Sequence, residues 1–224
     1  MTCLLALSYT MRAGEAWNPQ ANDEAVVTSG RMRFTVLTSR MIRIQYSSTS
    51  RFEDRATFAV VNRRLPVPRF TTQTEGGYLI LETDSLTLRY KVGSQPRATD
   101  QAPTNLSITF RMNGQECVWY PGKEDNLNLK GTNRTLDSQW GDNMRYKLED
   151  GLLSRSGWAV IDESPATKRG DGSTTFALQP DTEGFPWWAQ PVDKTATDWY
   201  FLGYGHDTGS CHSCRSRNRY LSKL

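Results

Sequence analysis

"RMRFTVLTSRMIRIQY", residues 31–46, alternates apolar and polar side chains in two runs that a short polar turn separates. Successive side chains of a strand point to opposite faces, so a period of two is typical of a strand with one buried face. The stretch therefore predicts two half-buried strands. The apolar faces consist of Met32, Phe34 and Val36 in the first run and Ile42, Ile44 and Tyr46 in the second.

The same period continues along most of the chain. The segments are "TFAVV" (57–61), "GYLILET" (77–83), "SLTLRYKV" (85–92), "LSITF" (106–110), "ECVWY" (116–120), "GWAVID" (157–162), "TTFAL" (174–178) and "DWYFLGY" (198–204). Turns are expected at Ser29-Gly30, Gly76-Gly77 and Asn113-Gly114. Residues 106–120 read as a hairpin, because Asn113-Gly114 accepts the positive φ that a two-residue hairpin turn needs. No helical period persists for three turns, so the fold class is all-β, a large antiparallel β-sandwich.

Composition supports one domain with a substantial core. The chain has 224 residues, of which 37% are hydrophobic and 11% aromatic. Its net charge of +3 comes from the end of the chain, where Arg215, Arg217, Arg219 and Lys223 follow Asp207 without an acidic residue. A nucleic-acid partner needs a basic stripe on the folded body, so none is expected.

Several classes of site are not supported by the sequence. The 4 cysteines are too scattered for a disulfide framework. Cys211 and Cys214 have the spacing of half a zinc site, but the other half is missing, so no metal is predicted. No stretch approaches the roughly 20 apolar residues of a membrane span. No phosphate-binding loop or cofactor motif is present, and no cofactor is expected.

The sequence also offers no complete catalytic site. Its 2 histidines, His206 and His212, stand at or beyond the end of the last predicted strand, which excludes a histidine relay inside the body. Adjacent acids such as Asp162 and Glu163 point apart on an extended chain and make poor catalytic pairs. We expect them to be solvated turn carboxylates, and no catalytic residue is assigned.

Aromatic residues gather in two polar stretches. "GFPWWAQP" contains Trp187 and Trp188, and Trp140 lies in "DSQWGDNMRY". An indole face beside Asp and Asn side chains suits a sugar ring. Trp187 and Trp188 equally fit a role in covering an open end of the sandwich.

Three ordered motifs carry a family resemblance: "NLNLKGTNRTLD" (126–137), "LEDGLLSRSGWAVIDES" (148–164) and "DWYFLGYGHD" (198–207). In this order they resemble the N-terminal domain of family 31 glycoside hydrolases, the α-glucosidases and α-xylosidases. The resemblance runs from about residue 25 to 207. It implies a galactose-mutarotase-like sandwich that precedes a (β/α)8 barrel, in which an aspartate nucleophile and an aspartate acid perform retaining hydrolysis. It also implies that 148–164 supports the face that docks against the barrel.

The expected organisation has three parts. Residues 1–24 form an N-terminal segment, 25–207 the sandwich domain, and 208–224 an unpatterned tail that we expect to be disordered and dispensable. The apolar run from Cys3 to Leu7 fits either a signal remnant, which favours a periplasmic or extracellular location, or a frayed start. The tail departs from the family pattern where a lead into the barrel is expected. A frameshifted or shortened reading frame and a genuine C-terminal element are the two alternatives.

The resemblance implies that this chain is a non-catalytic accessory domain. Such a domain supports a barrel, which is missing from the chain, and frames the substrate entrance of that barrel. A free-standing carbohydrate-binding module is the alternative, whereas an aldose epimerase would need a catalytic histidine in the body. Family members send a sandwich loop over the barrel mouth, which assigns a substrate rim to Asp137, Trp140 and Asp142. The expected ligand is an α-glucoside or α-xyloside, bound weakly.

Overall fold

The computed structural model describes residues 18–57, 59–131, 150–164, 176–180, 186–191 and 196–206. For 176–180 and 186–191 only the backbone is described. The expected tail therefore lies outside the described residues, as does most of the N-terminal segment. Apart from one short 3-10 helix, η1 (Asp23–Ala25), the regular structure described consists of β-strands.

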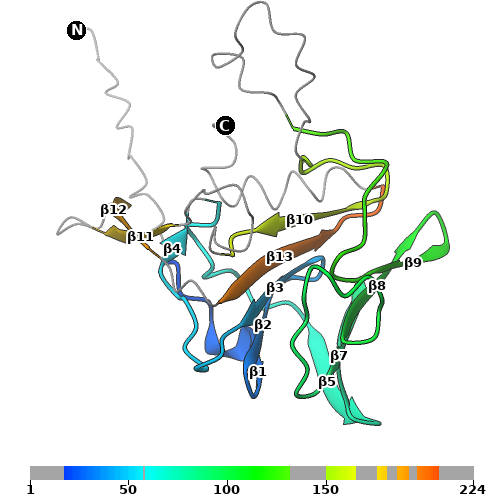
Figure 1. Ribbon diagram of the computed structural model, residues 1–224, viewed down its shortest axis with the longest axis horizontal. Helices are drawn as coiled ribbons and strands as arrows, with labels where there is room; N and C mark the ends of the chain where they lie inside the picture. The colour runs from blue at the N-terminus through cyan, green and yellow to red at the C-terminus, as the bar shows by residue number, and fades with distance from the viewer. Residues whose placement is uncertain are drawn as a thin grey trace, which may run out of the picture.

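Two five-stranded antiparallel sheets form the body of the protein (Figure 1). The first sheet has the order β1-β2-β3-β13-β10, with β1 (Val26–Ser29), β2 (Met32–Thr38), β3 (Met41–Tyr46), β13 (Thr197–Gly203) and β10 (Trp158–Asp162). The second sheet is a meander of β5 (Phe70–Glu75), β6 (Tyr78–Thr83), β7 (Leu86–Lys91), β8 (Leu106–Met112) and β9 (Gln115–Trp119). A small third sheet combines β12 (Pro186–Pro191), β11 (Phe176–Pro180) and β4 (Ala56–Thr57).

The main core lies between the two large sheets, which confirms the predicted all-β antiparallel sandwich. Aromatic rings meet across the interface: Phe34 and Tyr90 have centroids 5.3 Å apart, and Phe110 and Phe201 6.0 Å. The apolar faces predicted from residues 31–46 all belong to this core. Burial of such alternating faces is the main driving force for packing the two sheets together.

The β8–β9 hairpin closes as predicted. Asn113 and Gly114 both have positive φ, at 53° and 76°. Two successive residues with positive φ match the right-handed twist of the flanking strands. The register that follows pairs Met112 with Gln115 and Ile108 with Trp119, which places Trp119 at the end of the edge strand.

The outer face of the first sheet is buried as well, and here the prediction of half-buried strands was wrong. Every residue of β3 and β13 is buried. A second apolar cluster lies on this outer face, made of Leu37, Met41, Val60, Ala159, Tyr200, Leu202 and Tyr204. Residues 59–65 cross over it, and Ala59, Val60 and Leu65 pack there. The polar residues of β3 therefore lie in the interior.

Charged residues on this covered face are paired. Arg43 Nε and Nη2 donate to the two carboxylate oxygens of Asp198 at 2.8 and 2.5 Å, and Arg63 Nε donates to the Tyr200 hydroxyl at 2.7 Å. Burial acts to lower the pKa of Arg43, but the charge and hydrogen bond of Asp198, together with the nearby Tyr200 and Glu163, outweigh burial and raise the pKa. Burial also raises the pKa of the Tyr200 hydroxyl.

Glu163 contributes to the same interior. It is 7% exposed and accepts hydrogen bonds from the Thr57 hydroxyl and from the Ala59 N–H, the latter at 2.9 Å. Burial, followed by repulsion from Asp198, raises the pKa of Glu163. The expectation of a solvated turn carboxylate was therefore wrong for Glu163, because Thr57 and Ala59 bind it in the interior.

Strand boundaries differ from the sequence prediction at several places, and β1, β5 and β12 were not among the predicted strands. Among the described residues of segment 57–61, only Thr57 belongs to a strand, β4, whereas Val60 packs outside any strand. Strand β5 has no apolar alternation, and five of its six residues are exposed. It forms because its backbone pairs along the whole length of β6.

Candidate functional site

The predicted rim residues Asp137, Trp140 and Asp142 lie outside the described residues, within 132–149. The residues that flank this segment, 131 and 150, are described. Their side chains and backbone show how the segment is attached to the sandwich. We call the attachment, residues 125–131 and 150–156, the loop stem.

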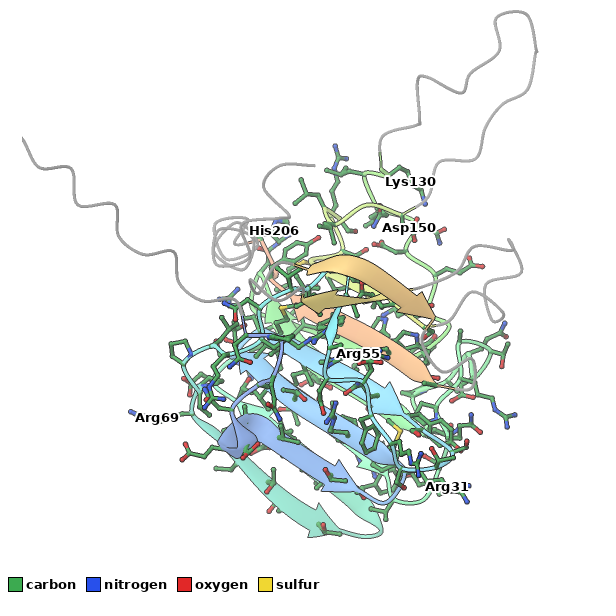
Figure 2. All side chains as sticks on the ribbon, turned by 90° about the vertical axis from the view of Figure 1, so that its left-hand side faces the viewer. Arg31, Arg55, Arg69, Lys130, Asp150 and His206 are labelled. Atoms are coloured by element: carbon green, nitrogen blue, oxygen red, sulfur yellow. The ribbon has the colours of Figure 1, made fainter. Side chains whose placement is uncertain are left out.

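Hydrogen bonds close the loop stem. Asn128 Nδ2 donates to the Gly151 carbonyl at 3.0 Å, and Asn128 Oδ1 accepts from the Gly151 N–H at 2.8 Å. Lys130 and Asp150, which lie nearer to segment 132–149 in the sequence, form an ion pair (Figure 2). Residues 128–131 and 150–151, which flank segment 132–149, are thereby held side by side.

Gly151 is required by this close approach. A Cβ at Gly151 would lie 2.7 Å from the Lys130 carbonyl oxygen and 2.9 Å from its carbon. Both atoms belong to the backbone, so they are not free to move aside as a flexible side chain would. The glycine in "EDGLLS" thus allows the two halves of the loop stem to touch.

Asp125 joins the loop stem to the strand that follows it. Its carboxylate accepts from the Ser156 hydroxyl at 2.7 Å and from the Leu127 N–H at 3.2 Å. Burial acts to raise the pKa of Asp125, but hydrogen bonds from Ser154, Ser156, Asn128 and Leu127 outweigh it and lower the pKa. Asp125 therefore remains ionised and holds the turn before β10 in place.

Tyr204 connects the third motif to the same place. Its hydroxyl accepts from the Ser154 N–H at 2.5 Å and donates toward the carbonyls of Ser154 and Trp158, at 3.2 and 3.3 Å. Gly205 N–H donates to the Gly157 carbonyl at 2.8 Å. Residues from all three sequence motifs, 126–131, 150–164 and 198–206, thus meet at the loop stem.

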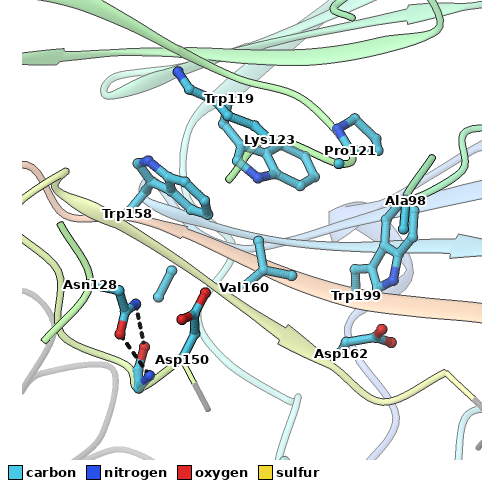
Figure 3. A pocket seen from close by; sticks show the side chains of 13 residues that line it. Ala98, Trp119, Pro121, Lys123, Asn128, Asp150, Trp158, Val160, Asp162 and Trp199 are labelled. Atoms are coloured by element: carbon cyan, nitrogen blue, oxygen red, sulfur yellow. Dashed lines mark hydrogen bonds between the residues drawn. The ribbon is translucent and has the colours of Figure 1, made fainter. Parts of the chain in front are cut away.

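A cleft of about 340 Å³ lies beside the loop stem, between the edge strands β9 and β10 (Figure 3). Three tryptophans line it: Trp119 at the end of β9, Trp158 at the start of β10 and Trp199 on β13. The Trp119 and Trp158 rings have centroids 6.4 Å apart and are tilted by 56°. Pro121 and Val160 add further apolar surface.

Polar side chains stand around the aromatic surface, namely Lys123, Asn128, Asp150 and Asp162. The Lys123 ammonium donates to the Val118 carbonyl. One oxygen of Asp162, Oδ1, accepts from the Ser164 N–H at 2.8 Å. Asp162 pairs directly with Trp199 in the sheet register and lies beside it in Figure 3. The cleft thus combines indole surface with carboxylate and amide groups.

The sequence correctly predicted that the adjacent acids Asp162 and Glu163 point apart, but it did not predict what surrounds them. Asp162 lines the cleft, whereas Glu163 binds Thr57 and Ala59 on the opposite side of the strand, so the two carboxylates do point apart. The alternation of side chains along β10 could have indicated this. Residues 158, 160 and 162 share one face, so Asp162 is a charged residue in an otherwise apolar row. Trp187 and Trp188 fall in β12, whose side chains are outside the description.

Three leucines of the loop stem form an exposed apolar surface. Leu127, Leu129 and Leu153 are 55%, 56% and 42% exposed. Leu129 N–H donates to the Leu153 carbonyl and Arg155 N–H to the Leu127 carbonyl, around the bridge between Asn128 and Ser154. This short antiparallel pairing places the three leucines on one face, which we call the leucine patch.

Other kinds of site are not seen in the part of the chain that the structure describes. No group of three metal-ligating side chains occurs there, and Cys117 is a free thiol. Within the same ranges, no helix is long and apolar enough to span a bilayer. His206 is exposed at the end of the last strand.

Comparisons with known proteins do not identify the chain. No protein-family model matches it, and none of the curated proteins searched matches its sequence.

Proposed function

We propose that this chain is the non-catalytic N-terminal sandwich domain of a family 31-like retaining α-glycosidase, which supports a catalytic barrel and frames its substrate entrance. The observation that supports the proposal is the meeting of the three motifs at the loop stem. Residues far apart in the sequence, such as Asn128, Ser154 and Tyr204, are joined there by hydrogen bonds. The closed stem gives segment 132–149 a fixed base, from which we propose that it reaches over a neighbouring active site.

The leucine patch gives such a domain a surface for its partner. Three large apolar side chains that share one face are unfavourable in water, and covering them contributes to association. The patch is part of the loop stem, so a barrel that covered it would lie next to segment 132–149. Supporting the barrel and framing its entrance would then use one end of the sandwich.

An association experiment tests this proposal. The chain is mixed with a family 31 barrel expressed without its own sandwich domain, and complex formation and hydrolysis of a nitrophenyl α-glycoside are measured. We expect no hydrolysis by the chain alone, and complex formation that is lost when Leu127, Leu129 and Leu153 are all replaced by Ser. Turnover by the purified chain would contradict the non-catalytic assignment. The gene downstream of the segment that encodes residues 198–206, read in all three frames, should encode such a barrel.

A free-standing carbohydrate-binding module is the second candidate, and the indole-lined cleft is the observation that favours it. The two candidates differ in their dependence on a partner. The proposed rim residues Asp137, Trp140 and Asp142 would bind a sugar no tighter than roughly millimolar without a barrel, because ordering a loop opposes the gain from one stacking contact. Titration with glucose, xylose and maltose should shift the Trp140 indole signal weakly. Saturable shifts around Trp187 and Trp188, with Trp140 silent, would favour the module.

A further inference from the structure

The cleft between β9 and β10 is lined by three largely buried tryptophans whose indole N–H groups have no hydrogen-bond partner among the described residues. Trp119, Trp158 and Trp199 are only 3%, 7% and 7% exposed. Among the residues described, no hydrogen bond is made by any of the three indole N–H groups. A buried tryptophan usually finds an acceptor, and a buried donor without one is destabilising. Three such donors call for an explanation.

All three side chains line the same cavity, which suggests a common acceptor. In Figure 3 the Trp119 indole stands across the cleft from Val160, and the Trp199 indole stands above Asp162. The rings come from three strands, β9, β10 and β13, in both sheets. Strands are rigid supports, so the donors are held in place before anything binds.

The cleft also provides a carboxylate acceptor. Asp162 Oδ1 accepts from Ser164, but Oδ2 accepts no hydrogen bond from any residue in the described ranges. The other polar side chains around the cleft already have partners: Asn128 binds Gly151, Asp150 pairs with Lys130, and Lys123 donates to Val118. The indole N–H groups and Asp162 Oδ2 are therefore available to a ligand, together with the remaining N–H groups of Lys123 and the second oxygen of Asp150.

From this set we propose that the cleft binds a single sugar residue, a neutral polyhydroxylated ring, through the indole groups of Trp119, Trp158 and Trp199 and the carboxylate of Asp162. A hydroxyl group both accepts and donates, so it satisfies an indole N–H and the carboxylate together. The apolar C–H face of the ring packs against indole and Val160. Sugar rings and tryptophan side chains share this combination of an apolar face and polar edges.

Charge and size limit the ligand. The carboxylates of Asp150 and Asp162 disfavour an anion, whereas the uncharged hydroxyl groups of a sugar can bind both the carboxylates and the Lys123 ammonium. The volume of about 340 Å³ lies near the lower end of the roughly 300–1,000 Å³ that small-molecule sites occupy. This size favours one sugar ring.

This inference does not depend on the proposed accessory-domain function, and it deepens the second candidate, the carbohydrate-binding module, which rests on the same cleft. The rim residues 137–142 would frame a partner's active site, whereas the cleft is formed by the sandwich itself. A sugar here serves to retain a carbohydrate on the domain. The two sites have different tryptophans, so one experiment separates them.

The test follows the indole N–H signals of the full chain by NMR during titration with methyl α-glucoside, xylose, maltose and maltoheptaose. We expect saturable shifts of the Trp119, Trp158 and Trp199 signals. Glucose 6-phosphate, which carries a negative charge, should bind much more weakly because Asp150 and Asp162 line the cleft. Tighter binding of maltoheptaose than of maltose would identify the end of a glucan chain as the ligand, and equal affinities a free sugar.

Two variants supply the decisive comparison. Asp162→Asn keeps an oxygen for the Ser164 N–H but removes the charge, and we expect it to weaken sugar binding roughly ten- to a hundredfold. Asp84→Asn, at an exposed position outside the cleft, should bind like the original chain. The inference is overturned if the three signals do not shift saturably, if glucose 6-phosphate binds equally well, or if Asp162→Asn has no effect. A shift of Trp140 alone would overturn the cleft site and leave the proposed function intact.

Discussion

The side-chain amide of Asn128 and the backbone of Gly151 hydrogen-bond in both directions, at 2.8 and 3.0 Å, across 23 residues of sequence. The Asn128 amide pairs with the Gly151 backbone as a neighbouring strand would. These two hydrogen bonds join the residues that flank segment 132–149 on either side. Asp125 accepts a hydrogen bond from the Asn128 amide, and the Tyr204 hydroxyl accepts one from the Ser154 N–H. The attachment of the proposed rim therefore depends on a small number of hydrogen bonds.

Replacing Asn128 tests that network. Asn128→Ala removes both hydrogen bonds to Gly151 and leaves its N–H and carbonyl without their partners, which should cost about 1–3 kcal/mol of stability. We expect a lower melting temperature and faster hydrogen exchange at the Gly151 N–H. Asn126→Ala is the matched control, because Asn126 is exposed two residues away. Equal effects of the two substitutions would show that the loop stem does not rely on this contact.

The leucine patch should cause self-association when no partner covers it. Leu127, Leu129 and Leu153 offer a continuous apolar surface, and two copies bury it by pairing. Sedimentation velocity should show concentration-dependent dimers or larger species, which replacement of all three leucines by Ser abolishes. Val92→Ser is the control, since Val92 is 47% exposed and lies in the turn after β7, a strand of the opposite sheet. A monomer at high concentration would argue against an exposed docking face.

The buried pair of Arg43 and Asp198 should respond asymmetrically to substitution. Asp198→Ala leaves a buried guanidinium without its counterion, so we expect a loss of about 3–5 kcal/mol. Replacing both residues together, with Arg43→Met and Asp198→Leu, should cost clearly less than Asp198→Ala alone. Urea unfolding of the two variants and the original chain measures the difference. A double variant as unstable as Asp198→Ala would show that the pair itself, and not the unpaired charge, determines stability.

Glu163 predicts a pH dependence of opposite sign to that of a salt-bridged carboxylate. Because folding raises its pKa, the folded protein binds a proton at a pH where the unfolded chain does not. This group's contribution to stability is therefore fully present below the ordinary glutamate pKa of about 4.3, and it falls as pH rises through the raised pKa.

Glu163→Gln should remove this dependence. The amide still accepts from the Ala59 N–H and avoids the buried charge, so we expect the variant to be at least as stable as the original chain at pH 7. The two proteins should converge as the pH is lowered toward 4. Glu124→Gln, at an exposed position, is the control. A loss of several kcal/mol at pH 7 in Glu163→Gln would mean that the ionised carboxylate is needed by Thr57 and Ala59.

The sequence by itself determined the sandwich. Alternation in residues 31–46 places Phe34 and Ile44 in the core, and the Asn113-Gly114 turn sets the register of the last hairpin. Both signals are local, because the period of a strand and the φ values of a turn depend on neighbouring residues alone. Strand β5 escaped this reading, since its pairing with β6 is a backbone property that leaves no apolar pattern in an exposed edge strand.

What only the tertiary structure decided is which polar residues are buried and which distant segments meet. No pattern near Arg43 or Glu163 in the sequence predicts that Ala59, Val60 and Leu65 pack over this side of the sheet. The cleft likewise needs Trp119, Trp158 and Trp199 from three strands, and the phase of Asp162 acquires meaning only when β9 stands opposite β10. Burial and convergence depend on how whole layers pack, and no local period in the chain encodes that packing.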